Sequence, residues 1–269
     1  LLAAERMPLA LKLMMRMMTA GATVKATSVP QAPQPATVSR YPWHTLKQSL
    51  PMTDHRTRFL QLALDADALR FGQFTLKSGR TSPYFFNAGR FDSGRLMAGL
   101  ASCYVDAAQA AGLQFDLLFG PAYKGIPLAT AVACDYAGRG RDLPLAFNRK
   151  EAKTHGEGGS LIGAPLAGKR VLIVDDVITA GTAIREALGI IADAGGIAAG
   201  IVVALDRQEI ASETDTRSAA QAVAAEAGIP VVAVADLGDL LAFADGNPEL
   251  VDFRAPLLDY RARYGCRAD

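Results

Sequence analysis

The sequence predicts an α/β fold built on a central parallel sheet. Short runs of consecutive apolar residues, such as Val171–Val174, are typical of strands that are buried on both faces of a parallel sheet. These runs alternate with helical segments of about ten to fifteen residues, which is the order of repeated strand–helix–strand units. Half of the 269 residues are hydrophobic, so the chain can bury a sizeable core.

The first part of this fold is expected to combine helices with a small unit of strands. Thr53 or Asp54 can cap a first helix. Residues 71–86 are interpreted as short strands and turns. A longer helix follows over roughly residues 95–111, where Gly112 ends it.

The middle of the chain contains two predicted strands, residues 115–119 and 143–147, on either side of a helix over about residues 125–136. Residues 149–163 are polar and charged and contain four glycines, so we expect a mobile loop there. The buried strand at residues 171–174 comes next.

The last part repeats the alternation. Helices are predicted over about residues 183–194 and 216–227, with buried strands at residues 201–205 and 231–234. The tail from Leu237 onward is expected to be helical. Ligands of parallel α/β sheets bind beyond the carboxyl ends of the strands. That rule makes the segments that follow these strands the candidate site.

Charge is distributed unevenly along the chain. The net charge is +1, from 28 Lys and Arg against 27 Asp and Glu, which argues against a nucleic-acid binder because such proteins normally carry a strong basic excess. Residues 1–51 contain three Lys and three Arg against one Glu, a net charge of +5. Residues 52–269 are therefore left with −4.

Residues 1–51 differ from the remainder in composition as well. They hold five of the seven Met and six of the fourteen Pro residues, and the stretch 29–35 is typical of an unstructured linker. An organelle transit peptide is one interpretation of such a basic segment. We favour an upstream leader, with Met52 as the start of the functional chain. Residues 1–51 are expected to be disordered, and residues 52–269 to form one catalytic domain.

The cysteines and the hydropathy pattern indicate in which cellular compartment the protein works. Cys103, Cys134 and Cys266 are far apart and no CxxC pair is present, so neither a disulfide framework nor a structural zinc site is supported. A reduced, cytoplasmic compartment is expected. No apolar run reaches the ~18 residues of a membrane-spanning helix, so we expect no membrane partner.

The most informative motif is VLIVDDVITAGT, residues 171–182. A buried strand ends in two adjacent carboxylates, Asp175 and Asp176, and a turn of small and hydroxyl residues leads into a helix. Backbone N–H groups and the hydroxyls of Thr179 and Thr182 can hold a phosphate at that helix N-terminus. The carboxylates would repel the phosphate unless they bind sugar hydroxyls or Mg²⁺. An Asp-Asp pair alone would be equally typical of an ordinary strand-to-helix turn.

Two further loops carry cations. Residues 120–125, GPAYKG, bring the backbone close to an anion and offer the point charge of Lys124. Residues 148–159, NRKEAKTHGEGG, combine cations with glycines, so they can close over an anionic leaving group and neutralise it. Composition alone would make either segment a solvated surface.

Together these motifs carry a family resemblance. Residues 171–182 resemble the phosphoribosyl pyrophosphate (PRPP) loop of type I phosphoribosyltransferases. FTLKSGR at 74–80, SPYFFN at 82–87 and LDRQE at 205–209 are similar to orotate phosphoribosyltransferases. The resemblance runs almost continuously from Met52 to about Tyr264. It implies the type I phosphoribosyltransferase fold, a central parallel sheet flanked by helices, with a small hood built from the N-terminal region of the domain.

The resemblance also implies roles for individual residues. Orotate would be bound by Phe85, Phe86, Thr179 and Arg207, with Arg207 pairing with its carboxylate. The catalytic residues would be Lys153, His155, Asp175 and Asp176. PRPP would be bound by Lys77, Tyr123, Lys124, Arg149, Lys150, Lys153, His155, Asp175, Asp176, Val177, Ile178, Thr179, Ala180, Gly181, Thr182 and Ala183. Mg²⁺ would be the cofactor, held mainly through PRPP rather than by a set of protein ligands.

The implied reaction transfers the phosphoribosyl group of PRPP to N1 of orotate, in pyrimidine biosynthesis. Orotate can lose its N1 proton, so no strong side-chain base is required, and His155 is not assigned as the base. The family acts as a homodimer that shares the cationic loop between subunits. Two alternatives stay open from the residues: a PRPP-sensing regulator without catalysis, and a phosphoribosyltransferase for another base. The retained cationic loop argues against the first, and Arg207 together with the Phe85–Phe86 segment argues against the second.

Overall fold

The structure is a computed structural model, and it describes residues 54–266 apart from 77–78, 154–158, 180 and 211–213. The predicted leader, residues 1–51, therefore lies outside the described residues.

A six-stranded sheet forms the centre of the fold, with the strand order β5-β4-β3-β6-β7-β8. All neighbouring strands are parallel except the antiparallel pair β4–β5. The predicted parallel sheet is thereby confirmed, with one antiparallel edge. Its strands are β3 (Leu117–Gly120), β4 (Leu145–Lys153), β5 (Gly159–Gly163), β6 (Arg170–Asp175), β7 (Ile197–Asp206) and β8 (Val231–Asp236).

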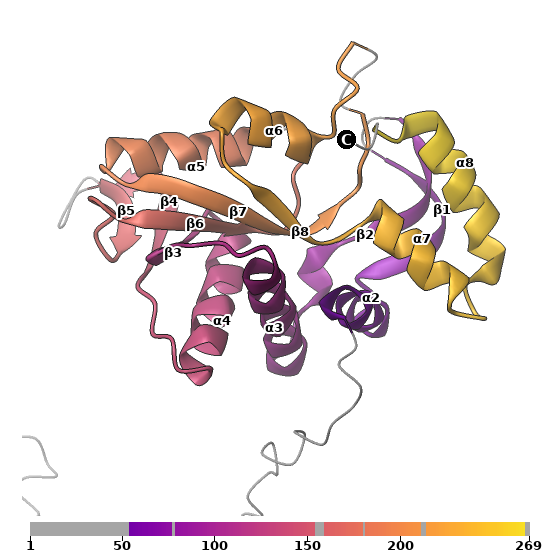
Figure 1. Ribbon diagram of the computed structural model, residues 1–269, viewed down its shortest axis with the longest axis horizontal. Helices are drawn as coiled ribbons and strands as arrows, with labels where there is room; N and C mark the ends of the chain where they lie inside the picture. Colours follow the sequence, from indigo (N-terminus) through magenta and orange to yellow (C-terminus); the bar gives the residue numbers. More distant parts are fainter. Residues whose placement is uncertain (1–53, 77–78, 154–158, 180, 211–213, 267–269) are drawn as a thin grey trace, which may run out of the picture. The chain divides into compact units, whose positions relative to one another are not determined.

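Helices cover both faces of this sheet. The first face packs against α3 (Gly94–Ala110) and α4 (Gly125–Gly138), and the second against α5 (Thr182–Asp193) and α6 (Ala219–Ala227) (Figure 1). Strand β6 shows why its sequence is continuously apolar. Leu172 and Val174 belong to one buried cluster, whereas Val171 and Ile173 belong to the other, so successive side chains enter opposite cores.

A two-stranded hairpin forms the predicted hood, but its support comes from both ends of the domain. Strand β1 (Leu69–Thr75) pairs antiparallel with β2 (Thr81–Phe86). The C-terminal helix α8 packs on the hairpin, with the Tyr84 and Tyr260 rings 6.2 Å apart. The sequence did not predict this contribution of the tail. The remaining elements are α2 (His55–Asp65), η2 (Ala88–Arg90), α7 (Leu237–Asp245), η3 (Val251–Phe253) and α8 (Arg254–Tyr264).

The prediction of a loop over residues 149–163 was wrong at both ends. Strand β4 continues to Lys153, and β5 begins at Gly159 and pairs with it. Residues 154–158, between the two strands, lie outside the described residues. Because β5 is the edge strand, this pair needs no continuous apolar run, and its polar composition concealed it.

The described helices include none that is both long enough and apolar enough to span a bilayer.

Candidate active site

The carboxyl ends of β3 and β6 bring the first two candidate segments together. The two strands are neighbours in the sheet and run parallel, so the segments that follow them emerge at the same edge. There Lys124 Nζ, from the β3–α4 loop, lies 2.5 Å from Asp176 Oδ2, which follows β6. A cation and a carboxylate that are 52 residues apart in the chain therefore share one site.

Both carboxylates of the Asp pair are buried. Asp175 is 8 % exposed and Asp176 is 7 % exposed. Burial raises the pKa of the Asp175 carboxyl to about 6, although a hydrogen bond from the Asp176 backbone N–H opposes the shift; the Asp176 charge adds to it and the Lys124 charge opposes it. The Tyr104 hydroxyl donates to the Asp175 carbonyl oxygen at 2.8 Å and so fixes the strand end from α3. Sequence reasoning did not find Tyr104, which carries no motif signal.

The β3–α4 loop is held by close backbone packing. A Cβ on Gly125 would lie 2.8 Å from the Val174 carbonyl oxygen, so only glycine fits where α4 begins against β6. The Ala122 backbone N–H donates to Asn148 Oδ1 at 2.9 Å, which ties the loop to β4. Sequence reasoning gave no role to Asn148, although it is the first residue of the cationic segment 148–159.

Two predicted binding residues extend from these segments into solvent. Tyr123 is 65 % exposed, and the ammonium group of Lys150 lies 5.2 Å from the centre of its ring. Arg149 is half-buried on β4. The backbone of Lys153 belongs to β4, but its side chain is outside the described residues, as are Lys77, His155 and Ala180 altogether.

The turn after β6 leaves the N-terminus of α5 open. Gly181 adopts φ +74°, and a Cβ there would lie 2.9 Å from Val223 Cγ2, so this position requires glycine. Among the described residues, no side chain forms a capping hydrogen bond at the N-terminus of α5. The N–H groups of its first turn are therefore available to an anion. The predicted phosphate residues Thr179, Thr182 and Ala183 are exposed there, and Val177 and Ile178 are half-buried.

Arg207 lies in a compact set of side chains that we call the Arg207 cluster: Ser82, Tyr84, Arg207, Glu209 and Tyr260. Its Nε atom donates to Glu209 Oε1 at 2.6 Å, and its guanidinium carbon lies 4.7 Å from the centre of the Tyr84 ring. The Tyr260 hydroxyl also donates to Glu209 Oε1, at 2.8 Å. The cluster thus joins the end of β7 to the hood and to α8.

The two predicted aromatic residues of the orotate site point to opposite faces of the hood hairpin. The Phe86 ring packs 5.9 Å from that of Phe59, on the core side. The Phe85 ring packs 5.6 Å from that of Phe74, and the Arg70 guanidinium lies 5.6 Å from both of these rings. Adjacent strand residues alternate in direction, so only one of the two rings can face a given ligand.

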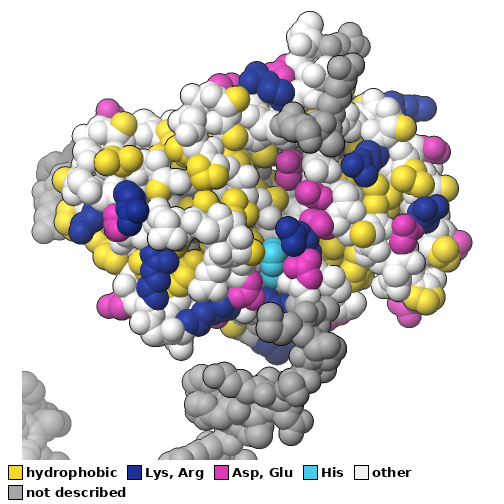
Figure 2. Space-filling view, in the orientation of Figure 1, with side chains coloured by type: hydrophobic (Ala, Val, Ile, Leu, Met, Phe, Trp, Pro, Cys, Tyr) yellow, Lys and Arg dark blue, Asp and Glu magenta, His cyan; other side chains and the backbone are white. Residues whose placement is uncertain are grey.

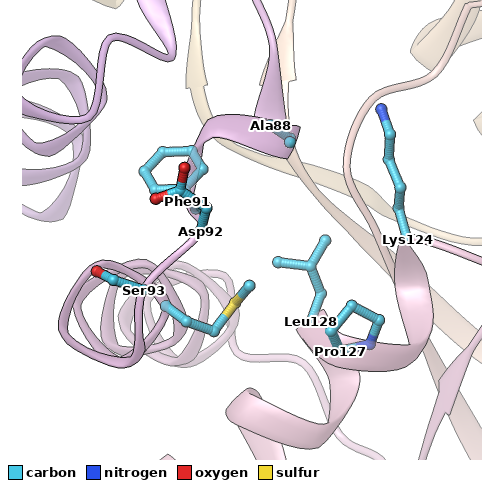
Figure 3. Close-up of a pocket in the computed structure, with 9 residues that line it drawn as sticks. Ala88, Phe91, Asp92, Ser93, Lys124, Pro127 and Leu128 are labelled. Atoms are coloured by element: carbon cyan, nitrogen blue, oxygen red, sulfur yellow. The ribbon is translucent and has the colours of Figure 1, made fainter.

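A pocket of about 420 Å³ lies beside the Lys124 segment. The Lys124 side chain stands at one side of this pocket, and the η2–α3 turn forms the opposite side (Figure 3). The lining residues are Ala88, Gly89, Phe91, Asp92, Ser93, Met97, Lys124, Pro127 and Leu128. Among the predicted site residues that the structure describes, only Lys124 lines the pocket, so the pocket borders the site rather than containing it.

The charged surface of the described residues is mixed. On the face in Figure 2, basic and acidic side chains are interspersed rather than gathered in one basic patch. Within the described part of the chain, no three or more His, Cys, Asp or Glu side chains are grouped so that they could hold a metal ion.

Comparisons with known proteins place this geometry in a family. The model of the phosphoribosyl transferase domain matches residues 92–221. The orotate phosphoribosyltransferase of Xanthomonas euvesicatoria is 83 % identical over 214 residues, which cover 80 % of this chain and 98 % of that protein. The enzyme of the same name from Stenotrophomonas maltophilia is 78 % identical over 217 residues, 81 % of this chain and 99 % of that protein.

A solved structure agrees with these relatives. The crystal structure of the Francisella tularensis orotate phosphoribosyltransferase superposes with a TM-score of 0.70 at 40 % identity. The superposition covers 77 % of this chain and 98 % of that one.

Proposed function

Because this chain belongs to the orotate phosphoribosyltransferase family, we propose which of its residues carry out the family's reaction. The chain is an enzyme that transfers the phosphoribosyl group of PRPP to N1 of orotate, which yields orotidine 5′-monophosphate and pyrophosphate in pyrimidine biosynthesis. The assignment of its site residues rests on the sequence motifs and, for the residues that the structure describes, on the contacts given above.

PRPP binds across the edge where β3 and β6 end. Asp175 and Asp176 accept hydrogen bonds from the ribose hydroxyls, and the turn at residues 177–183 holds the 5-phosphate at the open N-terminus of α5. Tyr123 and Lys124 hold the pyrophosphate, with Lys77 reaching it from the hood. The 2.5 Å contact between Lys124 Nζ and Asp176 Oδ2 carries this proposal, because it makes the cation for the pyrophosphate adjacent to the carboxylate for the ribose.

Charge stabilisation is the main catalytic contribution of these residues. The ribose passes through an oxocarbenium-like state, and the side chains of Asp175 and Asp176 place negative charge near the developing cation. Arg149, Lys150, Lys153 and His155 neutralise the leaving pyrophosphate. Orotate attacks through N1 after losing its proton, so no side chain is needed as a strong base.

The site residues fit a Mg²⁺ ion that arrives with PRPP. Two adjacent buried carboxylates are hard oxygen donors, but the described residues contain no larger set of ligands. Mg²⁺ commonly binds through one or two carboxylates and substrate phosphates, which matches this donor set. When bound, Mg²⁺ supplies further neutralisation of the pyrophosphate charge. Asp175 and Asp176 would be the protein groups nearest to it.

Orotate binds between the hood and the end of β7. Arg207 pairs with its carboxylate, Thr179 contacts the ring from the turn after β6, and Phe85 and Phe86 line the pocket. Since the two aromatic rings point to opposite faces, one of these residues contributes through its backbone.

The assembly and the location are part of the proposal. The chain functions as a homodimer in the cytoplasm, and its cationic loop acts across the subunit interface. The cationic segment at 149–155 is retained, so we do not favour a regulator that lacks catalysis. Arg207 in the LDRQE motif, with relatives named for orotate, likewise disfavours another base.

Substitution Lys124→Ala tests the pyrophosphate site. The loss of one charge-assisted contact, worth about 1.5–3 kcal/mol, should weaken competitive inhibition by pyrophosphate roughly 10- to 100-fold and raise the KM for PRPP. The KM for orotate should change little. Orotate absorbance measures the rate, with PRPP and Mg²⁺ each omitted in turn as controls for turnover.

Lys169→Ala is the matched variant, because Lys169 is exposed in the turn before β6, at the opposite edge of the sheet. It should leave pyrophosphate inhibition unchanged. Unchanged inhibition in Lys124→Ala as well would remove Lys124 from the pyrophosphate site.

A further inference from the structure

Among the members of the Arg207 cluster that have no role in the reaction as described so far are Glu209 and Tyr260. We propose that they are positioning residues that hold the Arg207 guanidinium with its Nη edge turned to the carboxylate of the pyrimidine substrate. The inference rests on the proposed role of Arg207 in binding orotate. It makes the C-terminal helix α8 part of the substrate site.

Glu209 is a fixed carboxylate rather than one free to move between partners. Arg207 Nε and the Tyr260 hydroxyl both donate to its Oε1 atom, at 2.6 and 2.8 Å. Its Oε2 atom lies 3.5 Å from Arg80 Nη1. These donors come from the end of β7, from α8 and from the residue before β2, and the Glu209 side chain is only 16 % exposed. A carboxylate with partners on three elements orients the guanidinium instead of competing with the substrate for it.

The contacts of Arg207 leave one edge of its guanidinium available. The five donors of this group lie in one plane, so engaging Nε fixes where the others point. Nη2 has only long contacts, at 3.4 Å, to Ser82 Oγ and the Tyr260 hydroxyl. Among the described residues, Nη1 has no hydrogen-bond partner. The two Nη atoms form the fork that matches a carboxylate in a bidentate pair.

The ring of Tyr84 fixes the tilt of the Arg207 guanidinium. Its carbon lies 4.7 Å from the centre of the Tyr84 ring, and Tyr84 is fully buried. Tyr260 packs edge-on to the same ring at 6.2 Å, so α8 also holds this platform. A pyrimidine without the carboxylate would leave the fixed Nη edge unpaired, and that loss discriminates against it.

Substitution Tyr260→Phe tests the inference, because it removes the hydroxyl and keeps the ring. Losing the hydroxyl that donates to Glu209 and accepts the long contact from Arg207 Nη2 should raise the KM for orotate about tenfold. The KM for PRPP and kcat should stay within about twofold, since the proposed function assigns no member of the cluster to PRPP or to the leaving group. Tyr264→Phe is the matched control on α8, because no hydrogen bond of the Tyr264 hydroxyl is found among the described residues, and it should leave all three constants unchanged.

Glu209→Gln separates positioning from competition. If Glu209 orients Arg207, this variant raises the KM for orotate; a fall would show that Glu209 competes with the substrate and would overturn the proposal. Equal rises in the KM for orotate and for PRPP, or no change in Tyr260→Phe, would also overturn it.

Arg207→Ala distinguishes failure of this inference from failure of the proposed function. If Arg207→Ala raises the KM for orotate and Tyr260→Phe does not, the positioning role of Glu209 and Tyr260 fails but the assignment of Arg207 stands. If Arg207→Ala leaves the KM for orotate unchanged, the assignment of Arg207 fails, and the inference fails with it.

Discussion

Asp175 shows how function and stability oppose one another at a single residue. The proposed mechanism requires its carboxylate to be ionised near a developing cation, but burial favours the protonated form and raises its pKa to about 6. The ordinary value is 3.8, so between about pH 4 and pH 6 the folded chain keeps a proton on Asp175 that the unfolded chain has released. The contribution of this group to folding stability therefore falls as pH rises through that range, and its full cost is present above pH 6.

Asp175→Asn should accordingly stabilise the unliganded protein at pH 7, by at most about 3 kcal/mol. The amide oxygen still accepts the bond from the Asp176 N–H but carries no charge to desolvate. Urea unfolding at pH 4 and pH 7 measures the effect, and the gain should vanish near pH 4. Asp142→Asn, at an exposed position between α4 and β4, should change stability little at either pH. A variant less stable than the parent at pH 7 would contradict the argument.

The sequence identified single residues of the site more readily than the groups that support them. Asp175, Asp176 and Lys124 stand in motifs whose spacing indicates their chemistry, and the structure places them at one edge of the sheet. Tyr260 stands in no motif, and its contact with Arg207 spans 53 residues. Such a contact depends on how α8 folds back onto the hood, which periodicity does not reveal.

At the scale of elements, the predictions succeeded for strands that are buried on both faces of the sheet. Strand β6 was predicted because both of its faces enter a core, and each enters a different cluster. The β4–β5 pair was missed because an edge pair with polar side chains resembles a loop in composition. The hood was predicted as strands from the N-terminal region, but its packing on α8 was not.

The junction of β3 with α4 is the element-scale feature on which the site depends most. Gly125→Ala would bring a Cβ to 2.8 Å from the Val174 carbonyl oxygen and 2.5 Å from Pro121 Cδ. This overpacking should destabilise the fold by about 1–3 kcal/mol and displace Lys124, so kcat/KM for PRPP should fall. Urea unfolding and the orotate assay measure the two effects.

Gly189→Ala is the same substitution as Gly125→Ala, but we expect it to stabilise the fold rather than destabilise it. Gly189 lies within α5, and a Cβ there would meet no atom within 4 Å. Because alanine favours a helix interior over glycine, this variant should gain about 0.5–1 kcal/mol and keep full activity. If both variants behaved alike, the close approach of α4 to β6 would not be what requires glycine at Gly125.

At the scale of the whole molecule, the near-zero net charge is an average over unlike parts. Residues 52–269 carry −4, yet their substrate is a polyanion. Recognition of this substrate therefore depends on individual cations rather than on a basic surface, with Lys124 at the edge where β3 and β6 end and Arg207 at the end of β7. Both of these cations belong to the described residues, so we expect the catalytic unit to be complete without residues 1–51.

Deletion of residues 1–51 should leave kcat and both KM values within about twofold and the thermal midpoint unchanged. The described sheet, both of its cores and the site are built from His55 onward. The Xanthomonas relative is matched over 98 % of its length by 80 % of this chain. The orotate assay and thermal unfolding make the measurement.

A longer deletion, of residues 1–65, supplies the contrast. It removes α2, whose Phe59, Leu60 and Ala63 are buried in the core. Losing a Phe and a Leu side chain from a packed core costs several kcal/mol, so this shorter protein should unfold or lose activity. If deletion of residues 1–51 alone had that effect, the domain boundary at Met52 would be wrong. If both shortened proteins remained active, α2 would not be needed to support the hood.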